Sequence, residues 1–407
     1  MHAGKNPNVY FGARPITTND IVHERFVSLP PREAVRVADA DGFAFRYINE
    51  SDADWRLLHK GRLTSSRLSG LLNMWSPPNA KVLGFKGSSH EGHRRMIDAY
   101  NHLMGSTCDL AVAGEAGDVA DIARHNLRAH LDANQRRSTP IDVDTDVSSD
   151  RILLEEMKLN KAKHLQSQGS IDRVRMSWGS AQEPSTILTL CEQFHDNSRY
   201  FLEVGLIEPD NDTLQRLGFE AGSLPPMGST PDCMCVEASS REQAIEIFSR
   251  NLLGDTGEGL NGGLVHAVEI KNTAPFRLSS KKKTFELWDR GPRERVDAIM
   301  VPQLQLHMLC SGANAAFLVS RSATKGCNVF EMQRDDEFLK LLLGIVKVFY
   351  QRYCIPGRVP PKNALSDLKE HKQLLLKTRE IAWRAKLREH IAHAPLAGAD
   401  PRCFLAV

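Results

Sequence analysis

An apolar run that ends in two charges constrains this chain more than any other segment: Gly262-Gly-Leu-Val-His-Ala-Val-Glu-Ile-Lys271. Branched apolar residues after a glycine turn signal predict a buried β-strand over 264–271. Because side chains alternate along a strand, Glu269 and Lys271 are expected on one face. Burying two charges is costly unless they pair or bind something. Taken alone, the pattern favours a structural ion pair at a strand end, and a functional site requires partners elsewhere in the chain.

The composition is that of a globular protein. The 407 residues are 41% hydrophobic and 25% charged, which suffices for one elaborated domain or for two. The formal net charge of +2 creates no global field, so affinity for nucleic acid must come from local basic patches. Eight cysteines at irregular spacings indicate no disulfide framework, and Cys233 and Cys235 have no second pair that would predict a zinc site.

No sorting signal is visible in the sequence. The first twenty residues lack the apolar core of a signal peptide, and no run of eighteen apolar residues exists. A transmembrane helix is therefore not expected. Together with the sparse cysteines, this predicts an intracellular protein of the cytoplasm or nucleus that is not secreted.

The N-terminal part offers one candidate phosphate site. Residues 1–50 read as a loose arm or as a peripheral strand and helix. Ser51-Asp-Ala-Asp then predicts a capped helix that Gly61 ends. Thr64-Ser-Ser-Arg opens a second helix with clustered hydroxyls. Such a start either seats a phosphate on free amides or is a plain N-cap.

The next hundred residues carry no motif. A solvated helix is expected over 76–104, and further helices over 118–133 and 153–168. The polar stretch 136–150 lacks aromatic residues and is the best candidate for a mobile insertion.

Two acidic residues precede the opening strand at positions where carboxylates could meet it. Glu183 lies in the first turn of an amphipathic helix, and a strand is expected over 200–207. Asp232 stands at the start of a strand over 233–236. A first-turn glutamate usually only complements the helix dipole, and Pro-Asp is a common turn dipeptide, so neither indicates a site by itself.

The remaining elements alternate between helix and strand. Expected in order are a helix over 241–253, a basic span over 281–295, a helix over 301–312, strands over 314–320 and 327–332, a helix over 335–353 and a long basic helix over 364–393. The basic span is a solvated loop or steers a phosphate backbone. The last helix either docks with a charged outer face or contacts DNA.

In this order the pieces resemble the YqaJ-like, lambda-exonuclease-like viral recombinase family of the PD-(D/E)xK nuclease superfamily. The resemblance covers about 52–74 and 176–350. The matching stretches are Trp55-Arg-Leu-Leu-His-Lys-Gly with Thr64-Ser-Ser-Arg, Trp178-Gly with Glu183-Pro, Gly228-Ser-Thr-Pro-Asp, Gly263-Leu with Glu269-Ile-Lys, and Gln303-Leu-Gln-Leu-His-Met.

The resemblance implies an α/β fold with a restriction-endonuclease-like core. Its central mixed β-sheet would be flanked by helices, with an N-terminal helical part and a C-terminal basic helix. The implied organisation is an N-terminal arm over 1–50, a nuclease domain over 51–354 and a basic helical tail over 355–407. Within the nuclease domain, about 76–170 would be an insertion and about 171–354 the catalytic core.

The implied activity is Mg²⁺-dependent exonuclease cleavage of linear double-stranded DNA, from 5′ to 3′, in recombination or end resection. Mn²⁺ is expected to substitute for Mg²⁺. The implied partners are DNA ends, a single-strand annealing or recombinase protein, and further copies of the chain. Two alternatives stay open: an endonuclease or RNA-cleaving nuclease of the same fold, and an inactive scaffold that binds DNA or a recombinase.

The implied metal site consists of oxygen donors, which hard divalent cations prefer. Asp232, Glu269 and the Ile270 carbonyl would bind metal directly, and Glu183 directly or through water. Two cations so held would activate a water and stabilise the leaving oxygen.

The other implied roles concern water and substrate. Lys271 would orient or help deprotonate the attacking water, with its pKa lowered by metals and burial. Gln303 would hold that water or a phosphate oxygen. The residues expected to contact substrate are Ser66, Arg67, His59 and Gln305.

The chain departs from the family pattern at four places. Cys233 replaces a glycine, Asn272-Thr273 replaces Cys-Pro after the lysine, and His59 stands where the family often has arginine. The spacing between Asp232 and Glu269 is also long, because the helix over 241–253 intervenes.

Overall fold

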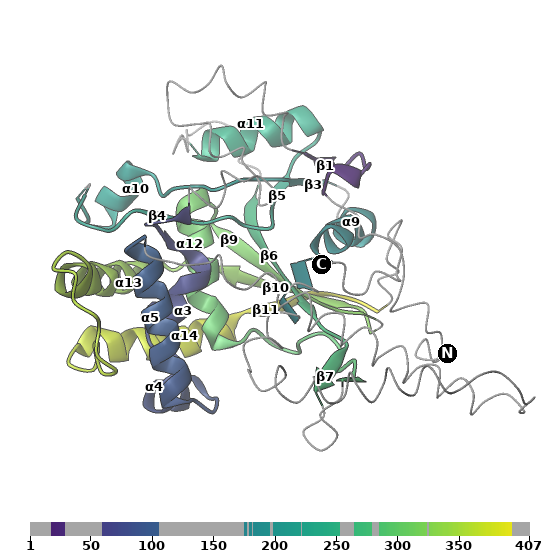
Figure 1. Ribbon diagram of the computed structural model, residues 1–407. Helices are drawn as coiled ribbons and strands as arrows, with labels where there is room; N and C mark the ends of the chain where they lie inside the picture. Colours follow the sequence, from purple (N-terminus) through teal and green to yellow (C-terminus); the bar gives the residue numbers. More distant parts are fainter. Residues whose placement is uncertain are drawn as a thin grey trace, which may run out of the picture.

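The structure of the protein, a computed structural model, covers most of the two regions that carry the motifs (Figure 1). The residues that it describes are 18–28, 59–105, 175–176, 179–180, 182–195, 198–220, 222–252, 264–278, 285–323 and 325–392. Trp55, Trp178, the helices expected over 118–133 and 153–168, the stretch 136–150 and the lysines at 281–283 lie outside them.

A seven-stranded sheet in the order β1-β3-β5-β6-β9-β10-β11 forms the centre of the molecule. The strands are β1 (Phe26–Val27), β3 (Arg199–Leu202), β5 (Cys233–Glu237), β6 (Val265–Thr273), β9 (Ala315–Ser322), β10 (Cys327–Gln333) and β11 (Lys386–Ile391). The β1–β3 and β6–β9 pairs are parallel and the others antiparallel. The sheet is therefore mixed, and helices flank it (Figure 1), which confirms the α/β prediction at this level.

Two further sheets consist of two short strands each. Strand β2 (Leu63–Thr64) pairs in parallel with β4 (Met227–Gly228), and β7 (Phe276–Leu278) pairs with β8 (Phe285–Leu287) in antiparallel fashion. The first pairing is important for the site, because β4 leads directly into the segment that ends at Asp232. It thereby ties the N-terminal hydroxyl cluster to the candidate catalytic region.

The helices lie on both sides of the sheet (Figure 1). They are α3 (Leu68–Leu71), α4 (Pro77–Leu83), α5 (Ser89–Leu103), α9 (Glu183–Gln193), α10 (Asn211–Arg216), α11 (Arg241–Leu252), α12 (Val301–Ser311), α13 (Asp336–Phe349) and α14 (Lys369–Arg384). Short helical turns are η3 (Thr18–Asp20), η6 (Ser65–Arg67) and η8 (Ala298–Met300), and a π-helical turn, η9 (Tyr350–Cys354), extends α13.

Strand β6 divides its side chains between two hydrophobic clusters, as alternation requires. Val268 and Ile270 belong to a cluster with the apolar side of α9. Val265 and Ala267 belong to a larger cluster with α12, α13 and α14. The predicted faces are confirmed, and Glu269 consequently lies on the α12 side of the sheet.

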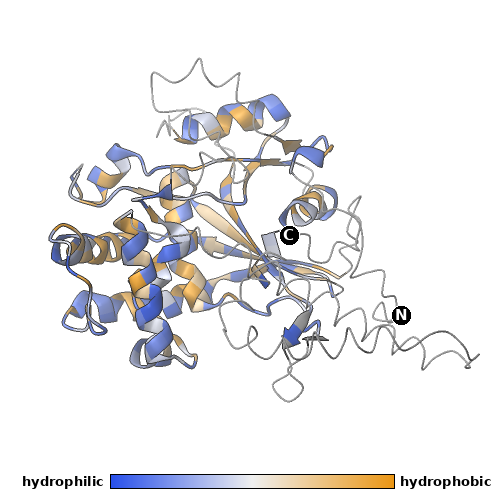
Figure 2. Cartoon of the chain, in the orientation of Figure 1, coloured by the Kyte–Doolittle hydropathy of each residue, from blue (hydrophilic) through white to orange (hydrophobic). Residues whose placement is uncertain are grey.

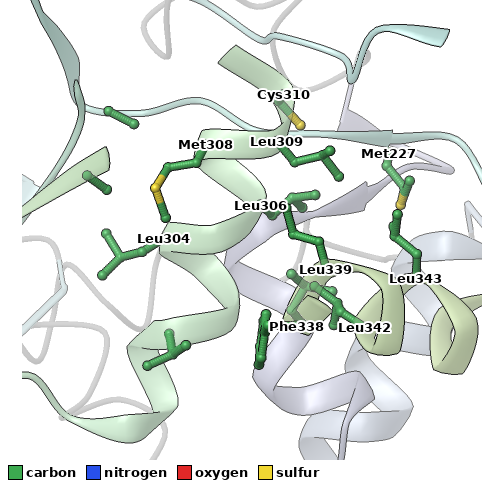
Figure 3. Packing of buried hydrophobic residues seen from close by; sticks show 14 of the residues in the cluster. Met227, Leu304, Leu306, Met308, Leu309, Cys310, Phe338, Leu339, Leu342 and Leu343 are labelled. Carbon is green, nitrogen blue, oxygen red and sulfur yellow. The ribbon is translucent and has the colours of Figure 1, made fainter. Parts of the chain in front are cut away.

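The larger cluster is built around α12 (Figure 3). Leu306 points toward the α13 residues Phe338 and Leu339, whereas Leu304 and Met308 point from the other side of the helix. All five side chains are buried. Apolar colour accordingly follows the central strands and the helix faces turned toward them (Figure 2). Packing on two sides fixes α12 against the sheet, which positions every polar residue in its first turns.

The C-terminal prediction of one helix over 364–393 is wrong. Helix α14 occupies only Lys369–Arg384, and β11 follows at Lys386–Ile391, where it pairs with β10 in antiparallel fashion. The physical reason is that β10 would otherwise be an exposed sheet edge, which β11 covers. The segment is thus part of the sheet and not a separate helical tail.

The implied insertion over about 76–170 begins with α4 and α5, and its boundary stays a prediction. Helices α4 and α5 contribute Leu83, Met96 and Leu103 to the main hydrophobic cluster, so they belong to the core and only one side of α5 is solvated. The strand expected over 200–207 is shorter: β3 ends at Leu202, and Ile207 instead forms an isolated bridge with Ser229. No helix in the described ranges is long and apolar enough to cross a membrane.

His266 makes the stability of the sheet depend on pH. Its ring stacks on Phe317 at a centroid distance of 4.1 Å, and burial, with the charges of Arg199 and Arg388, lowers its pKa to about 4. Between pH 6.5 and about 4 the unfolded chain therefore binds a proton that the folded chain does not. We therefore expect the free energy of unfolding to fall by about 3 kcal/mol as the pH falls through that range, because of this one histidine.

Urea unfolding of the wild type and the His266→Gln variant at several pH values measures this loss. The wild type should lose stability relative to the variant on acidification. His90→Gln is the matched control, since His90 is exposed on α5. Parallel pH dependence of the wild type and His266→Gln would contradict the assignment.

Candidate active site

The candidate site lies where β5 begins and β6 ends. The backbone N–H of Asp232 donates to the Val268 carbonyl at 3.0 Å. In return the Asp232 carboxylate accepts the Ile270 N–H through Oδ2 at 2.5 Å. This reciprocal pair fixes the Asp232 side chain beside the β6 backbone. The Ile270 side chain is buried on the α9 side, so its backbone faces the site while its side chain anchors the strand.

The Glu269 carboxylate has three polar partners in the site. It is only 3% exposed, and its Oε1 accepts from Gln303 Nε2 at 2.7 Å and contacts Lys271 Nζ. Its Oε2 lies 2.9 Å from His307 Nε2. Gln303 and His307 are four residues apart on α12 and so share one face of that helix. Two elements, β6 and α12, therefore hold one carboxylate between them.

His307 is a functional candidate that the sequence reasoning missed. It is fully buried, and because a carboxylate only accepts, its Nε2 must carry the hydrogen. Its Nδ1 has no hydrogen-bond partner among the described residues. The available signal was its position one helical turn after Gln303, on the side that faces Glu269.

Three carboxylates influence one another electrostatically here. Burial raises the pKa of Asp232 well above its usual value, and the negative charges of Glu269 and Glu183 raise it further. Glu183, in the first turn of α9, is thus brought to the same site as predicted. Burial would also raise the pKa of Glu269, but Lys271 and His307 overcome it and bring that pKa to about 2.

The expected lowering of the Lys271 pKa is not what the structure gives. Burial does lower the pKa of Lys271, but the charges of Glu269, Asp232 and Glu183 outweigh it, and the pKa is raised. Its side chain remains 31% exposed, and its ammonium stays charged beside these acids. The prediction left out the charges of these three acids, which decide the direction of the shift.

Asn272 explains one departure from the family pattern. Its Oδ1 accepts from Thr186 Oγ1 at 2.8 Å, and its Nδ2 donates to the Gly179 carbonyl at 2.9 Å. Arg321 Nη1 also donates to Thr186 Oγ1, at 3.2 Å. These bonds tie the first turns of α9 to the end of β6. Asn272 thereby holds the helix that carries Glu183 against the strand that carries Glu269.

The predicted substrate contacts divide into two groups. Ser66 and Arg67 lie on η6, which packs against α12; Ser66 is exposed, with its Oγ 3.4 Å from Thr64 Oγ1. His59 is buried, which leaves little of its ring for a phosphate.

For Gln305 the expected substrate role is wrong. The side chain is fully buried, donates to the Gln333 carbonyl at 2.9 Å and accepts the Asp335 N–H at 2.9 Å. Both ends of its amide are therefore occupied by the backbone that leads into α13, which makes it a structural residue.

The donor set suits a hard divalent cation by its chemistry. In the described ranges no three His, Cys, Asp or Glu groups converge in metal-ligand geometry. However, a carboxylate offers about four lone-pair positions, and Glu269 uses three, for Lys271, Gln303 and His307. Asp232 and Glu269 thus keep acceptor capacity, and the clustered negative charges of the three acids fit a cation with oxygen ligands such as Mg²⁺.

Comparison of the chain with protein-family models and with curated proteins gives no match. The reading of the site therefore depends on its own residues and their geometry.

Removing the His307 imidazole should destabilise the protein. His307→Ala leaves one oxygen of a buried carboxylate without its donor, which costs about 2–4 kcal/mol of the free energy of unfolding through the lost hydrogen bond and the cavity. His307→Gln keeps a donor and should recover part of that loss. Urea denaturation measures both. In the exposed control His90→Ala the change should stay within about 0.5 kcal/mol, and an equally small effect of His307→Ala would refute the contact.

Proposed function

We propose that this chain is a metal-dependent DNA nuclease that hydrolyses linear double-stranded DNA from its ends. The observation that carries the proposal is the buried meeting of Asp232, Glu269 and Lys271 at one strand exit, with Glu183 in electrostatic range. An ion pair needed only for stability would not require two further acids, since burying like charges costs stability. Strongly perturbed acids at one place are typical of catalytic sites.

Each residue has a role that its contacts support. Asp232 and Glu269, with the Ile270 carbonyl, would hold Mg²⁺ or Mn²⁺, and Glu183 would complete the set. The bound cation would supply Lewis-acid stabilisation of the phosphate and acidify a water. Lys271 would orient the attacking water, and Gln303 would hold the same water or a phosphate oxygen. His307 would not touch the metal or the substrate itself; it would orient the Glu269 carboxylate through its hydrogen bond.

An end-directed activity is favoured by the position of η6. The β2–β4 pairing fixes the segment that precedes Ser66 and Arg67 beside the segment that leads to Asp232, and η6 packs on the helix that carries Gln303. A hydroxyl and a guanidinium together suit a terminal phosphate. A 5′-to-3′ direction follows if that phosphate is the 5′ end. We further propose a single-strand annealing or recombinase partner and self-association, as the family resemblance implies.

The first test is the loss of Mg²⁺-dependent cleavage on substitution. Lys271→Ala should lower the rate on linear duplex DNA by about 10²–10⁴-fold, because it removes the group that handles the water. Asp232→Asn should do likewise and raise the Mg²⁺ concentration needed. Chelation with EDTA should stop the wild type. The rate of mononucleotide release is the measurement, with nicked circles, closed circles and RNA supplied in parallel.

Glu337→Gln is the control for this test, because Glu337 is exposed on α13 and 71% of its side chain is accessible. It should cut at the wild-type rate. Cleavage of closed circles as fast as of linear duplex would exclude an exonuclease, and a Lys271→Ala protein that still cuts would exclude this site.

A second test concerns the 5′ end. Arg67→Ala should reduce the preference for 5′-phosphorylated over 5′-hydroxyl linear duplex by about tenfold, the effect of one lost charge-assisted contact. The matched control Lys81→Ala removes a cation from α4 and should keep the preference. If Arg67→Ala keeps the wild-type preference, Arg67 does not contact the 5′-phosphate.

A further inference from the structure

A second pocket lies between the N-terminal helices and α14, apart from the acids of the candidate active site. Its volume is about 390 Å³, within the range of small-ligand sites. Its walls include two tryptophans, Trp75 and Trp383, and two arginines, Arg295 and Arg379. None of these four residues has a part in the proposed catalytic chemistry.

The aromatic walls of this pocket differ in how they are held. Trp75 is fixed from two directions, since Phe85 contacts its ring edge-on at a centroid distance of 5.4 Å and the Arg95 guanidinium lies 4.3 Å from its ring. Its Nε1 is buried and has no hydrogen-bond partner among the described residues. Trp383, at the end of α14, is 77% exposed. An indole so exposed costs free energy unless something covers it.

The charges of the pocket select the class of ligand. Arg295 is exposed and makes no ion pair with any residue that the structure describes. Arg379 is exposed one turn before Trp383 and donates to the Val82 carbonyl at 3.2 Å. Asp297, the one acidic wall residue in the part of the chain that the structure describes, pairs with Arg293. Two guanidiniums beside two indoles disfavour a cationic ligand and suit a flat group joined to an anion.

The pocket is connected to the candidate active site by one short segment. The Arg293 N–H donates to Ser320 Oγ at 2.9 Å, and Ser320 is the register partner of Lys271. Residues 295–299 then line the pocket, and Gln303 contacts Glu269. Between Arg295 and Gln303 the backbone spans at most about 20 Å. That distance corresponds to about six nucleotides of a strand in a duplex, and an extended single strand spans it with fewer.

From these observations we infer that the pocket binds an unpaired base of single-stranded DNA. The base stacks on Trp383 within the pocket, and Arg295 and Arg379 meet the adjacent phosphates. Because the pocket would guide a strand to or from the proposed nuclease site, its role rests on that function. Base binding by the pocket and the proposed nuclease activity can be tested separately, since binding is measured without cleavage.

The test measures the affinity for a fluorescein-labelled oligo(dT) of twelve nucleotides by fluorescence anisotropy. EDTA is present so that binding is measured without cleavage. Trp383→Ala should weaken binding by about 5- to 150-fold, the range for losing one base–aromatic stack, and Trp383→Phe should recover most of it. Arg295→Ala should weaken binding and flatten its dependence on salt, because one phosphate contact is lost. A fully paired hairpin of the same length should bind the wild type and Trp383→Ala equally.

Ile355→Ala is the matched control, since Ile355 is also a large exposed apolar residue and does not line the pocket. Circular dichroism checks that each variant is folded. Unchanged oligo(dT) affinity in folded Trp383→Ala would overturn the inference. So would equal weakening by Ile355→Ala, or binding of an acidic aromatic peptide in place of oligo(dT). If the wild type cuts no DNA while Trp383→Ala loses affinity for oligo(dT), the nuclease assignment fails and the pocket stands.

Discussion

The buried carboxylate of Glu269 is the interaction on which the rest of this structure depends. It sits on the central strand of the sheet and is held by Lys271 from the same strand and by Gln303 and His307 from α12. An unpaired charge at this depth would cost several kcal/mol, so strand and helix must keep this relation. The packing of α12 between sheet and α13 therefore stabilises the fold and at the same time fixes the acid that the proposed chemistry needs.

Local patterns were sufficient to predict the central elements. Alternation placed Val268 and Ile270 on one face of β6 and Glu269 on the other, and glycine and proline signals located α12 and β5. The meeting of Glu183, Asp232, Glu269 and Gln303 was predicted by the order of motifs, and the structure brings these residues together.

The failures have a common physical cause, which is that long-range contacts override local preference. The stretch after Ala385 reads as helical by itself, but β10 offers an unpaired edge and the chain becomes strand β11. Gln305 resembles a substrate ligand by its spacing from Gln303, but it faces the backbone before α13. Likewise, the sequence could not show that Asn272 forms a hydrogen bond with α9, because its partner Thr186 lies 86 positions away in the chain.

The contacts that join the two ends of the chain have a consequence for how the protein folds. His371 Nε2 lies 2.8 Å from the Leu72 carbonyl, 299 positions away, and Asn73 donates to the Lys362 carbonyl across 289 positions. Contacts so distant in sequence form late, because the entropy of closing the loop must be overcome first. Helix α3 is therefore synthesised 299 residues before its His371 partner, and this contact cannot form while the ribosome still holds that part of the chain. The packing around α3 is completed after α14 has emerged, and not while the N-terminal part is being made.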